Sequence, residues 1–352
     1  MRGGEIDWPA VKRVLVVKLR SIGDTVLSTP SLIALKRYLP HAQIDILLED
    51  WVAPLLDEFD SVDNVLTVGK SMSSRLVTAR KIRRNKYDVI FNLHGGTTGT
   101  FFCYASGARH RVGYETSRYN YFYTHLLSSA TDFWNREKIH SVEHQLALLG
   151  FVGVPVDDRP RSRLAVTETA CTTLEEKLAK SAFLTPHSAF ALLHPAAAFA
   201  TKQWPTENFA RTAEYLADKG LGAIAIVAKH ETQVAEQLLA ASKVPILALN
   251  DLTLPEITAL ASKAAIFVGN DSGVAHIAAA VQTPSVVIFG SSNRVHWRPW
   301  TDAPNEIVYE EFPCQPCPGY TCEVYGEPKC ILSIKPEAVF AAIDRILNTM
   351  SL

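Results

Sequence analysis

The chain has 352 residues, of which 47% are hydrophobic, and its formal net charge is -1 at pH 7. This length suffices for two domains with well-filled cores, and the composition excludes a disordered chain. The near-neutral charge argues against a protein that coats nucleic acid, although local basic clusters remain compatible with it, so we expect no nucleic-acid partner. No apolar run approaches the roughly 20 residues that span a bilayer, and the first residues lack a signal-peptide core. We therefore expect a cytoplasmic protein.

Apolar, β-branched runs alternate with helical patterns in the first half of the chain. Helices are predicted near Ser31, Ala53 and Val77, and strands at 14–19, 44–48, 64–68 and 89–93. Strands that alternate with helices form a parallel sheet with helices on both faces. The first half is therefore predicted to be a doubly wound α/β domain.

A charged, proline-containing stretch at 157–163 then interrupts the pattern and is typical of a linker. A second α/β set follows, with helices predicted near Phe209, Val234, Ile257 and Ala278 and strands at 190–193, 223–227, 245–249, 265–268 and 285–289. We predict two Rossmann-like domains that face a cleft, because two such halves leave a ligand-binding cleft between them.

The segment VLVVKLRSIGDTVLSTP, at 14–30, places a carboxylate just beyond a buried strand. Lys18 and Arg20 share one face of the strand end, and Gly23 is expected to supply the turn before Asp24. A helical spacing follows, which Pro30 must kink or restart. Ligands bind outside the carboxyl ends of parallel strands, so Asp24 either acts on a substrate or merely caps the helix.

A second motif, AAIFVGNDSGVAHIAAAVQTPSVVIFG at 264–290, joins a strand to an alanine-rich helix. The first amides of a helix carry partial positive charge and suit phosphate. Gly273 lets an anion approach the backbone, Ser272 adds a hydroxyl donor, and Asp271 caps the helix or accepts from a sugar hydroxyl. An ordinary strand-cap-helix junction is the alternative. His276 follows and either faces the ligand or packs in the core.

Two charged side chains in the second half also follow strands. Lys202 lies on a loop after the strand at 190–193, where a lysine supplies the positive charge that a diphosphate leaving group needs. Glu231 follows the strand at 223–227 and opens a helix. It either accepts from a ribose hydroxyl or simply favours the helix N-terminus, just as Lys202 is either a ligand contact or a solvated loop residue.

Six cysteines in a chain of this length do not indicate a secreted disulfide scaffold. Four of them gather near the end of the chain, with one CxxC pair and otherwise non-standard spacings: Cys314, Cys317, Cys322 and Cys330. The pattern favours reduced thiols or a labile disulfide over structural zinc. We therefore predict no required cofactor and no catalytic metal.

The three segments KLRSIGDTVLSTP, LHPAAAFATKQWP and FVGNDSGVAHIAAAVQTPSVVIFG resemble the signature regions of the ADP-heptose:lipopolysaccharide heptosyltransferases, glycosyltransferase family nine. FNLHGG at 91–96, RVGY at 111–114 and HSVEHQLALLG at 140–150 extend the likeness over nearly the whole chain. The resemblance implies a GT-B fold with an acceptor-binding domain at 1–160 and a nucleotide-sugar domain at 161–334. It also implies that a helix within 335–352 packs back on the first domain.

The resemblance further implies inverting transfer of heptose from ADP-L-glycero-D-manno-heptose to the inner core of lipopolysaccharide. Asp24 would be the base, and the acceptor side would include Arg20, Gly23, His94 and Arg111. The donor side would comprise Lys202, Glu231, Asp271, Ser272, Gly273 and His276. The loop 196–200 is alanine-rich where relatives commonly carry hydroxyl residues, so donor contacts there are fewer or move to Thr201.

This chemistry needs a base on one face of the anomeric carbon and anion stabilisation on the other, but no metal. The helix N-terminus lowers the pKa of Asp24, so the base needs desolvation or close approach to the hydroxyl. One alternative is a non-catalytic sugar-nucleotide or lipid-binding module, against which Asp24 and Lys202 argue. Another is a transferase that uses a different nucleotide sugar. LRSIGDT lacks G-x-G-x-x-G, which argues against a nicotinamide-dependent oxidoreductase.

The acceptor half carries a basic stretch, SSRLVTARKIRRNK at 73–86, that contains no acidic residue. Arg109, Arg111 and Arg118 lie further along the same half. Such charge suits a phosphorylated lipid acceptor and an anionic bilayer, although a solvated helix face explains it equally well. We hypothesise peripheral association with the inner face of the inner membrane.

Overall fold

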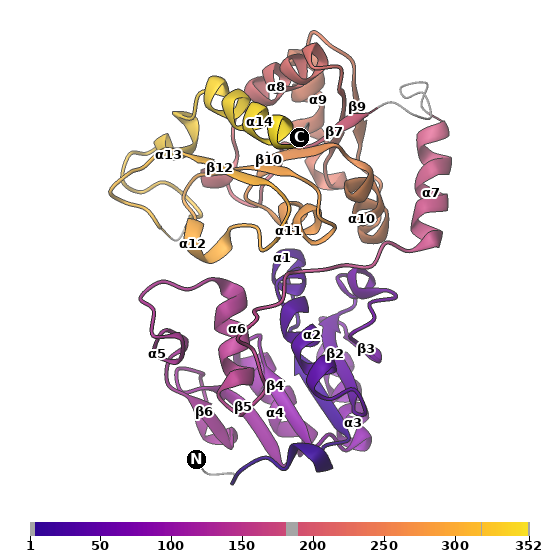
Figure 1. The fold of residues 1–352 in the computed structure, drawn as a ribbon, viewed down its shortest axis with the longest axis vertical. Helices are drawn as coiled ribbons and strands as arrows, with labels where there is room; N and C mark the ends of the chain where they lie inside the picture. Colours follow the sequence, from indigo (N-terminus) through magenta and orange to yellow (C-terminus); the bar gives the residue numbers. More distant parts are fainter. Residues whose placement is uncertain (1–3, 181–188, 318, 351–352) are drawn as a thin grey trace. The chain divides into compact units, whose positions relative to one another are not determined.

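The computed structural model describes residues 4–180, 189–317 and 319–350, and the chain divides into two units, Met1–Ala165 and Val166–Leu352 (Figure 1). The boundary falls slightly later than the predicted 160, because the charged stretch before it is tied to the first unit. The Arg163 backbone N–H donates to Thr29 Oγ1 at 3.1 Å, and the Arg163 guanidinium lies 2.9 Å from Asp60 Oδ1. Residues 157–163 therefore belong structurally to the first unit.

The first unit is built on a fully parallel six-stranded sheet of order β3-β2-β1-β4-β5-β6. Its strands are β1 (Arg13–Val17), β2 (Gln43–Glu49), β3 (Asn64–Val68), β4 (Val89–Asn92), β5 (His110–Tyr114) and β6 (His125–Leu127). Residues 14–17 are fully buried because β1 lies between β2 and β4 and is covered on both faces.

Among residues 4–165, the α-helices that accompany this sheet are α1 (Ile22–Val26), α2 (Thr29–Tyr38), α3 (Met72–Asn85), α4 (Thr97–Ser106), α5 (Ala130–Trp134) and α6 (Ser141–Gly150). Helices α3 and α4 pack together on one face, where Leu15 and Val17 join Ile82 and Phe102 in the core (Figure 1). Helices α2 and α6 pack together as a second pair. The segment near Ala53 forms a 3₁₀ turn, Ala53–Leu56, instead of the predicted helix.

The second unit repeats the arrangement, with a parallel sheet of order β12-β11-β10-β7-β8-β9. Its strands are β7 (Phe190–His194), β8 (Gly222–Ile226), β9 (Ile246–Leu249), β10 (Ile266–Asn270), β11 (Ser285–Phe289) and β12 (Asn305–Tyr309). Its helices are α7 (Glu168–Ala179), α8 (Thr206–Asp218), α9 (Thr232–Ala241), α10 (Leu254–Lys263), α11 (Gly273–Ala280), α12 (Arg294–Trp297), α13 (Lys329–Leu332) and α14 (Pro336–Met350). Both units thus have the doubly wound architecture predicted from the sequence.

The C-terminal helix α14 packs within the second unit. Val339, Ala342, Ile343 and Ile346 are buried in the same core as residues of β10 and β11, and α14 contacts α8, β11 and β12. Its apolar face is thus covered by its own sheet, and the expected packing on the first domain stays a prediction. In the described ranges 4–180, 189–317 and 319–350, we find no helix long and apolar enough to cross a bilayer.

Candidate active-site residues in each unit

In each sheet, the strand order reverses between the two central strands. These are β1 and β4 in the first unit and β7 and β10 in the second. Loops from such neighbouring strands diverge to opposite faces, and the crevice at their carboxyl ends is where open α/β sheets bind ligands. Asp24 follows β1 and His94 follows β4, while Lys202 follows β7 and Asp271 follows β10. The main predicted residues of each unit therefore lie at its switch point.

Asp24 lies inside the first turn of α1 and does not cap it. The N-cap is Ser21, and Gly23 is a buried helical residue, so the expectation that Gly23 forms the turn is wrong. The loop 18–21 turns the chain instead. Pro30 lies in the first turn of α2, where its missing N–H costs no helical hydrogen bond. The sequence analysis predicted that Pro30 either kinks or restarts the helix that follows Asp24. The structure shows a restart, because α1 ends at Val26 and α2 begins at Thr29.

A buried lysine holds the Asp24 carboxylate in place. Lys18 Nζ lies 2.8 Å from Asp24 Oδ1 and donates to the Leu93 carbonyl at 3.1 Å. Ser21 Oγ donates to Asp24 Oδ2 at 3.0 Å. The Lys18 side chain is 7% exposed, whereas that of Asp24 is 29% exposed. The lysine therefore links the ends of β1 and β4 and orients a carboxylate that solvent still reaches.

The electrostatics keep Asp24 ionised. Burial raises the pKa of Asp24, but the Lys18 charge and the hydrogen bonds from Lys18 and Ser21 outweigh burial and hold the pKa below its ordinary value. The sequence predicted that the helix N-terminus lowers the pKa of Asp24, and the structure shows that Lys18 lowers it through direct contact. A carboxylate of low pKa is a weak base, so a catalytic role for Asp24 requires close approach to the group that it would deprotonate.

We expect Lys18→Met to move the acid limb of the pH dependence of kcat/KM upward by about one to three units, because burial of Asp24 is then opposed only by the hydrogen bonds from Ser21. In the wild type, the lowered pKa of Asp24 contributes stability above its ordinary pKa that is lost as pH falls through the folded-state pKa. The variant loses this contribution at neutral pH. Activity and thermal unfolding across pH measure both effects, with Lys70→Met as the exposed-lysine control. An unshifted acid limb would contradict this role of Lys18.

His94 and Arg20, both predicted to contact the acceptor, line one small hollow of about 60 Å³. Burial first, and then the Lys18 charge, lower the pKa of His94, which favours its neutral form. The His94 backbone is held by Asn92, whose Oδ1 accepts from the N–H groups of His94 and Gly95 at 3.2 and 3.1 Å. A neutral imidazole and an arginine thus stand beside the sheet end that carries Asp24.

Arg111 lies apart from this group. It is near the start of β5, where it pairs with Ile90 in the middle of the sheet. Its Nε donates to the Phe122 carbonyl at 2.6 Å and its Nη1 to the Ala108 carbonyl at 2.5 Å. The structure therefore does not bring Arg111 together with Asp24, His94 and Arg20.

In the second unit, Lys202 and Asp271 form a largely buried ion pair. Lys202 Nζ lies 2.8 Å from Asp271 Oδ2, with side-chain exposures of 22% and 5%. Asp271 accordingly does not cap α11, whose N-cap is Ser272. The 3₁₀ turn Ala200–Lys202 is fixed because the Ser291 N–H donates to the Thr201 carbonyl at 3.2 Å. A diphosphate at Lys202 must share this ammonium group with Asp271.

Asn270 positions both residues and was missed in the sequence. Its Nδ2 donates to the Pro195 carbonyl at 2.8 Å, and its Oδ1 accepts from the Trp204 N–H at 3.0 Å. The buried amide thereby joins the end of β10 to the loop around Lys202. The sequence analysis selected its neighbour Asp271 because a carboxylate indicates a role in catalysis or ligand binding. A buried amide needs hydrogen-bond partners, but the sequence alone does not show that Asn270 is buried.

Ser272 makes no capping hydrogen bond to α11, and its Oγ instead lies 3.2 Å from His194 Nδ1. Burial lowers the pKa of His194 to about 4, so the ring is neutral at physiological pH. Gly273 is the first residue of α11 and His276 is buried within it. Lys202, together with the amides that open α11, therefore supplies positive potential at this switch point.

Two residues expected on the donor side have structural partners. Glu231 Oε2 accepts from the Ala228 N–H at 2.8 Å, which is the helix-terminus role that was weighed against a ribose contact. Thr201 is buried, and its hydroxyl donates to the Gly319 carbonyl and accepts from Ser291 Oγ. Thr201 is therefore unsuited to replace hydroxyl contacts missing from the loop 196–200.

The C-terminal cysteines are thiols in this structure. Burial, followed by the charges of Cys314, Cys317 and Cys322, raises the pKa of the Cys330 thiol. Among residues 4–180, 189–317 and 319–350, no group of three or more histidine, cysteine or acidic side chains is placed to hold a metal ion. The state of these cysteines stays a prediction.

Comparison with known proteins identifies a class. The fold resembles that of E. coli ADP-heptose lps heptosyltransferase II, with 19% identity, a TM-score of 0.81, and coverage of 97% of this chain and 100% of that one. It also resembles E. coli heptosyltransferase WaaC with ADP-2-deoxy-2-fluoro heptose, with 19% identity, a TM-score of 0.66, and coverage of 95% and 99%. The two parallel six-stranded sheets are those of the GT-B glycosyltransferase fold.

The family follows from the sequence match. The model of glycosyltransferase family 9 (heptosyltransferase) matches residues 75–326, and the chain belongs to this family. Lipooligosaccharide heptosyltransferase 2 of Haemophilus ducreyi is 26% identical over 237 residues. That match covers 64% of this chain and 66% of the relative, so slightly less than two thirds of the relative's length is spanned.

Proposed function

We propose that this protein transfers heptose from ADP-L-glycero-D-manno-heptose to the inner core of lipopolysaccharide, with inversion at the anomeric carbon. The observation that carries the proposal is the Lys18–Asp24 pair at the end of β1, in a chain of family 9. Lys18 keeps the partly exposed Asp24 carboxylate ionised at the carboxyl end of β1, which is where open α/β sheets bind ligands. The named activity of the Haemophilus relative, lipooligosaccharide heptosyl transfer, supports the choice of acceptor class.

The proposed donor residues lie in the second unit. Lys202 and the first amides of α11 stabilise the departing diphosphate, while Ser272 adds a hydroxyl donor. Gly273 allows close approach to the backbone. Glu231 and His276 are the remaining proposed donor residues; His276 is buried in α11, and Glu231 Oε2 accepts from the Ala228 N–H. The structure of E. coli WaaC with ADP-2-deoxy-2-fluoro heptose supports the choice of an ADP-sugar.

The proposed reaction is one displacement. Asp24 accepts the proton of the acceptor hydroxyl as that oxygen attacks the anomeric carbon, and the bond to the ADP oxygen breaks on the opposite face. Arg20, Gly23 and His94 are proposed to line the acceptor side, and Arg111 to bind a more distant part of the acceptor. Lys202 and backbone amides balance the diphosphate charge, so the proposed chemistry requires no metal ion.

The proposed setting is the cytoplasm, at the inner face of the inner membrane, where a lipid-anchored acceptor is accessible. The residues that support this are the basic side chains of α3, a helix without acidic residues. Flotation with vesicles that contain anionic lipid measures the association, which we expect to weaken as salt is raised. Absence of binding at low salt would contradict it.

A donor-exchange assay tests the proposed function. Purified protein is incubated with ADP-heptose, ADP-glucose or UDP-glucose and a set of truncated lipopolysaccharide acceptors, and products are identified by mass spectrometry. We expect one added heptose on one acceptor with ADP-heptose. Equal transfer from ADP-glucose would indicate a different nucleotide sugar, and donor binding without transfer to any acceptor would favour the non-catalytic module.

A further inference from the structure

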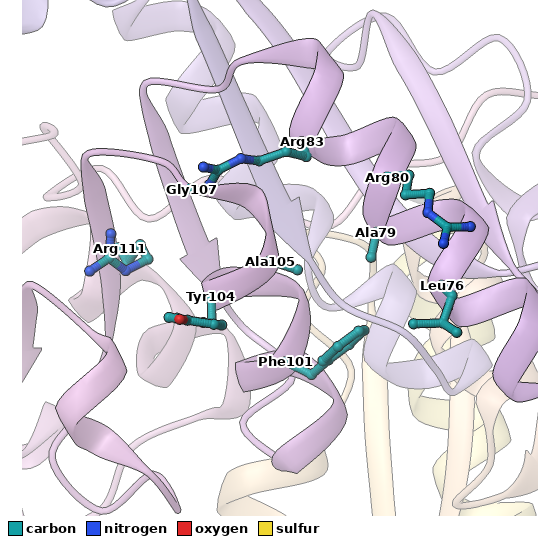
Figure 2. Close-up of a pocket in the computed structure, with 9 residues that line it drawn as sticks. All are labelled: Leu76, Ala79, Arg80, Arg83, Phe101, Tyr104, Ala105, Gly107 and Arg111. Carbon is teal, nitrogen blue, oxygen red and sulfur yellow. The ribbon is translucent and has the colours of Figure 1, made fainter.

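A large hollow of the first unit lies between α3 and α4, away from Asp24. Its volume is about 540 Å³. Figure 2 shows side chains of both helices around it, with Arg111 contributed by β5. The lining residues are Leu76, Ala79, Arg80, Arg83, Phe101, Tyr104, Ala105, Gly107 and Arg111. Of the proposed acceptor residues only Arg111 is among them, and Lys18, Asp24 and His94 are not, so this hollow lies apart from Asp24.

Three guanidinium groups surround the hollow. Among the ion pairs of the described residues, none includes Arg80, Arg83 or Arg111. Arg83 extends over Gly107 at the C-terminal end of α4, where an added Cβ would lie 1.4 Å from Arg83 Nη1 (Figure 2). Arg111 is oriented by its two carbonyl acceptors. The hollow therefore has an arginine rim whose charge is available to an anion.

The same hollow has apolar walls that solvent reaches. Tyr104 is 58% exposed, Leu76 45% and Phe101 37%. The exposed apolar surface continues along α3 through Met72 and Val77. It also continues through a ring contact, since the Tyr104 and Phe122 centroids are 4.4 Å apart in a tilted arrangement. Exposed aromatic and aliphatic side chains interleaved with arginine are typical of a surface that contacts the membrane interface.

We propose that the α3–α4 hollow binds one anionic phospholipid of the bilayer, its phosphate beside Arg83 and its glycerol and upper acyl carbons on Phe101, Tyr104 and Leu76. Arg80 and Arg111 add positive charge on either side of the hollow. A free inorganic anion would pair with the arginines but leave the apolar walls exposed to solvent. A neutral lipid would cover the apolar walls but leave the arginine charges unpaired. An anionic lipid does both. This inference rests on the proposed membrane association and assigns it to a specific site. It is independent of which sugar is transferred.

Vesicle sedimentation tests the site with a matched pair of variants. The pocket variant combines Arg80→Ala and Arg83→Ala. The control combines Lys81→Ala and Arg84→Ala, which removes the same charge from exposed positions of the same helix outside the lining. For vesicles of phosphatidylcholine with phosphatidylglycerol, we expect the pocket variant to lose at least about tenfold more affinity than the control. Equal losses would show diffuse attraction and overturn the assigned site.

A second titration uses dihexanoyl phosphatidylglycerol below its micelle concentration, with thermal unfolding as the check that each variant folds. We expect saturable binding that Tyr104→Ser weakens, and no comparable binding of inorganic phosphate. Equally strong phosphate binding, insensitive to Tyr104→Ser, would define a simple anion site and contradict the proposal. Competition by a deacylated acceptor oligosaccharide would instead assign the hollow to the acceptor. Absence of vesicle binding by the wild type would overturn both the membrane association and this site, while heptose transfer is judged by its own assay.

Discussion

Asp24→Asn is expected to bind ADP-heptose with unchanged affinity and to lower kcat by about 10²- to 10⁴-fold, the range that a positioned general base supplies. The amide is nearly isosteric with the carboxylate, so the fold of the loop is preserved. Its oxygen accepts from Lys18 in place of Oδ1, and its NH2 group donates to Ser21 Oγ in place of the bond that Oδ2 accepted. It cannot accept the proton of the acceptor hydroxyl. Steady-state transfer and calorimetric titration of the donor measure the two quantities separately.

Ser21→Ala is the matched control for this variant. It removes one hydrogen bond to Asp24 but leaves the base and the Lys18 contact in place, so we expect a loss of about tenfold or less. Transfer by Asp24→Asn within a few-fold of the wild type would show that another group is the base. A parallel collapse of donor binding and thermal stability would show that Asp24 is structural.

Lys202→Ala is expected to weaken ADP binding by about 10- to 100-fold, because a charge-assisted contact to a phosphate is lost. Adenosine binding should stay unchanged, since the nucleoside carries no phosphate. Titrations of both ligands therefore separate a diphosphate contact from a general loss of structure. Equal weakening of ADP and adenosine would contradict the assigned contact.

The buried partner of Lys202 requires a second variant. Lys202→Ala leaves the Asp271 carboxylate buried without its cation, which is destabilising by itself. The double variant Lys202→Ala with Asp271→Asn removes that unpaired charge, so we expect recovery of the unfolding temperature without recovery of ADP affinity. Recovery of both would show that the weakened binding was a consequence of instability.

Sequence patterning predicted the central strands because they are continuous apolar runs. β3 and β11 have the predicted bounds, 64–68 and 285–289, and the other predicted strands shift by one or two residues. Strands β5, β6 and β12 were missed. All three contain polar residues such as histidine, arginine, asparagine or glutamate, which interrupt the apolar pattern. In addition, β6 and β12 lie at sheet edges, where a strand needs less apolar cover.

The local sequence predicted which residues lie at the strand ends, but it did not predict their partners. Asp24, Lys202 and Asp271 each follow a central strand, as the motifs indicated. The roles of Lys18 and Asn270 became visible only through the carbonyls and amides that they contact on other loops. Such contacts join residues up to 75 positions apart, so no local spacing reveals them.

The anomeric configuration of the product tests the central claim most directly. A single displacement with a carboxylate base inverts the configuration of the heptose relative to ADP-heptose, so NMR of the isolated product should show only the inverted linkage. A retained linkage would require an intermediate or a front-face mechanism and would contradict Asp24 as the base of a single displacement.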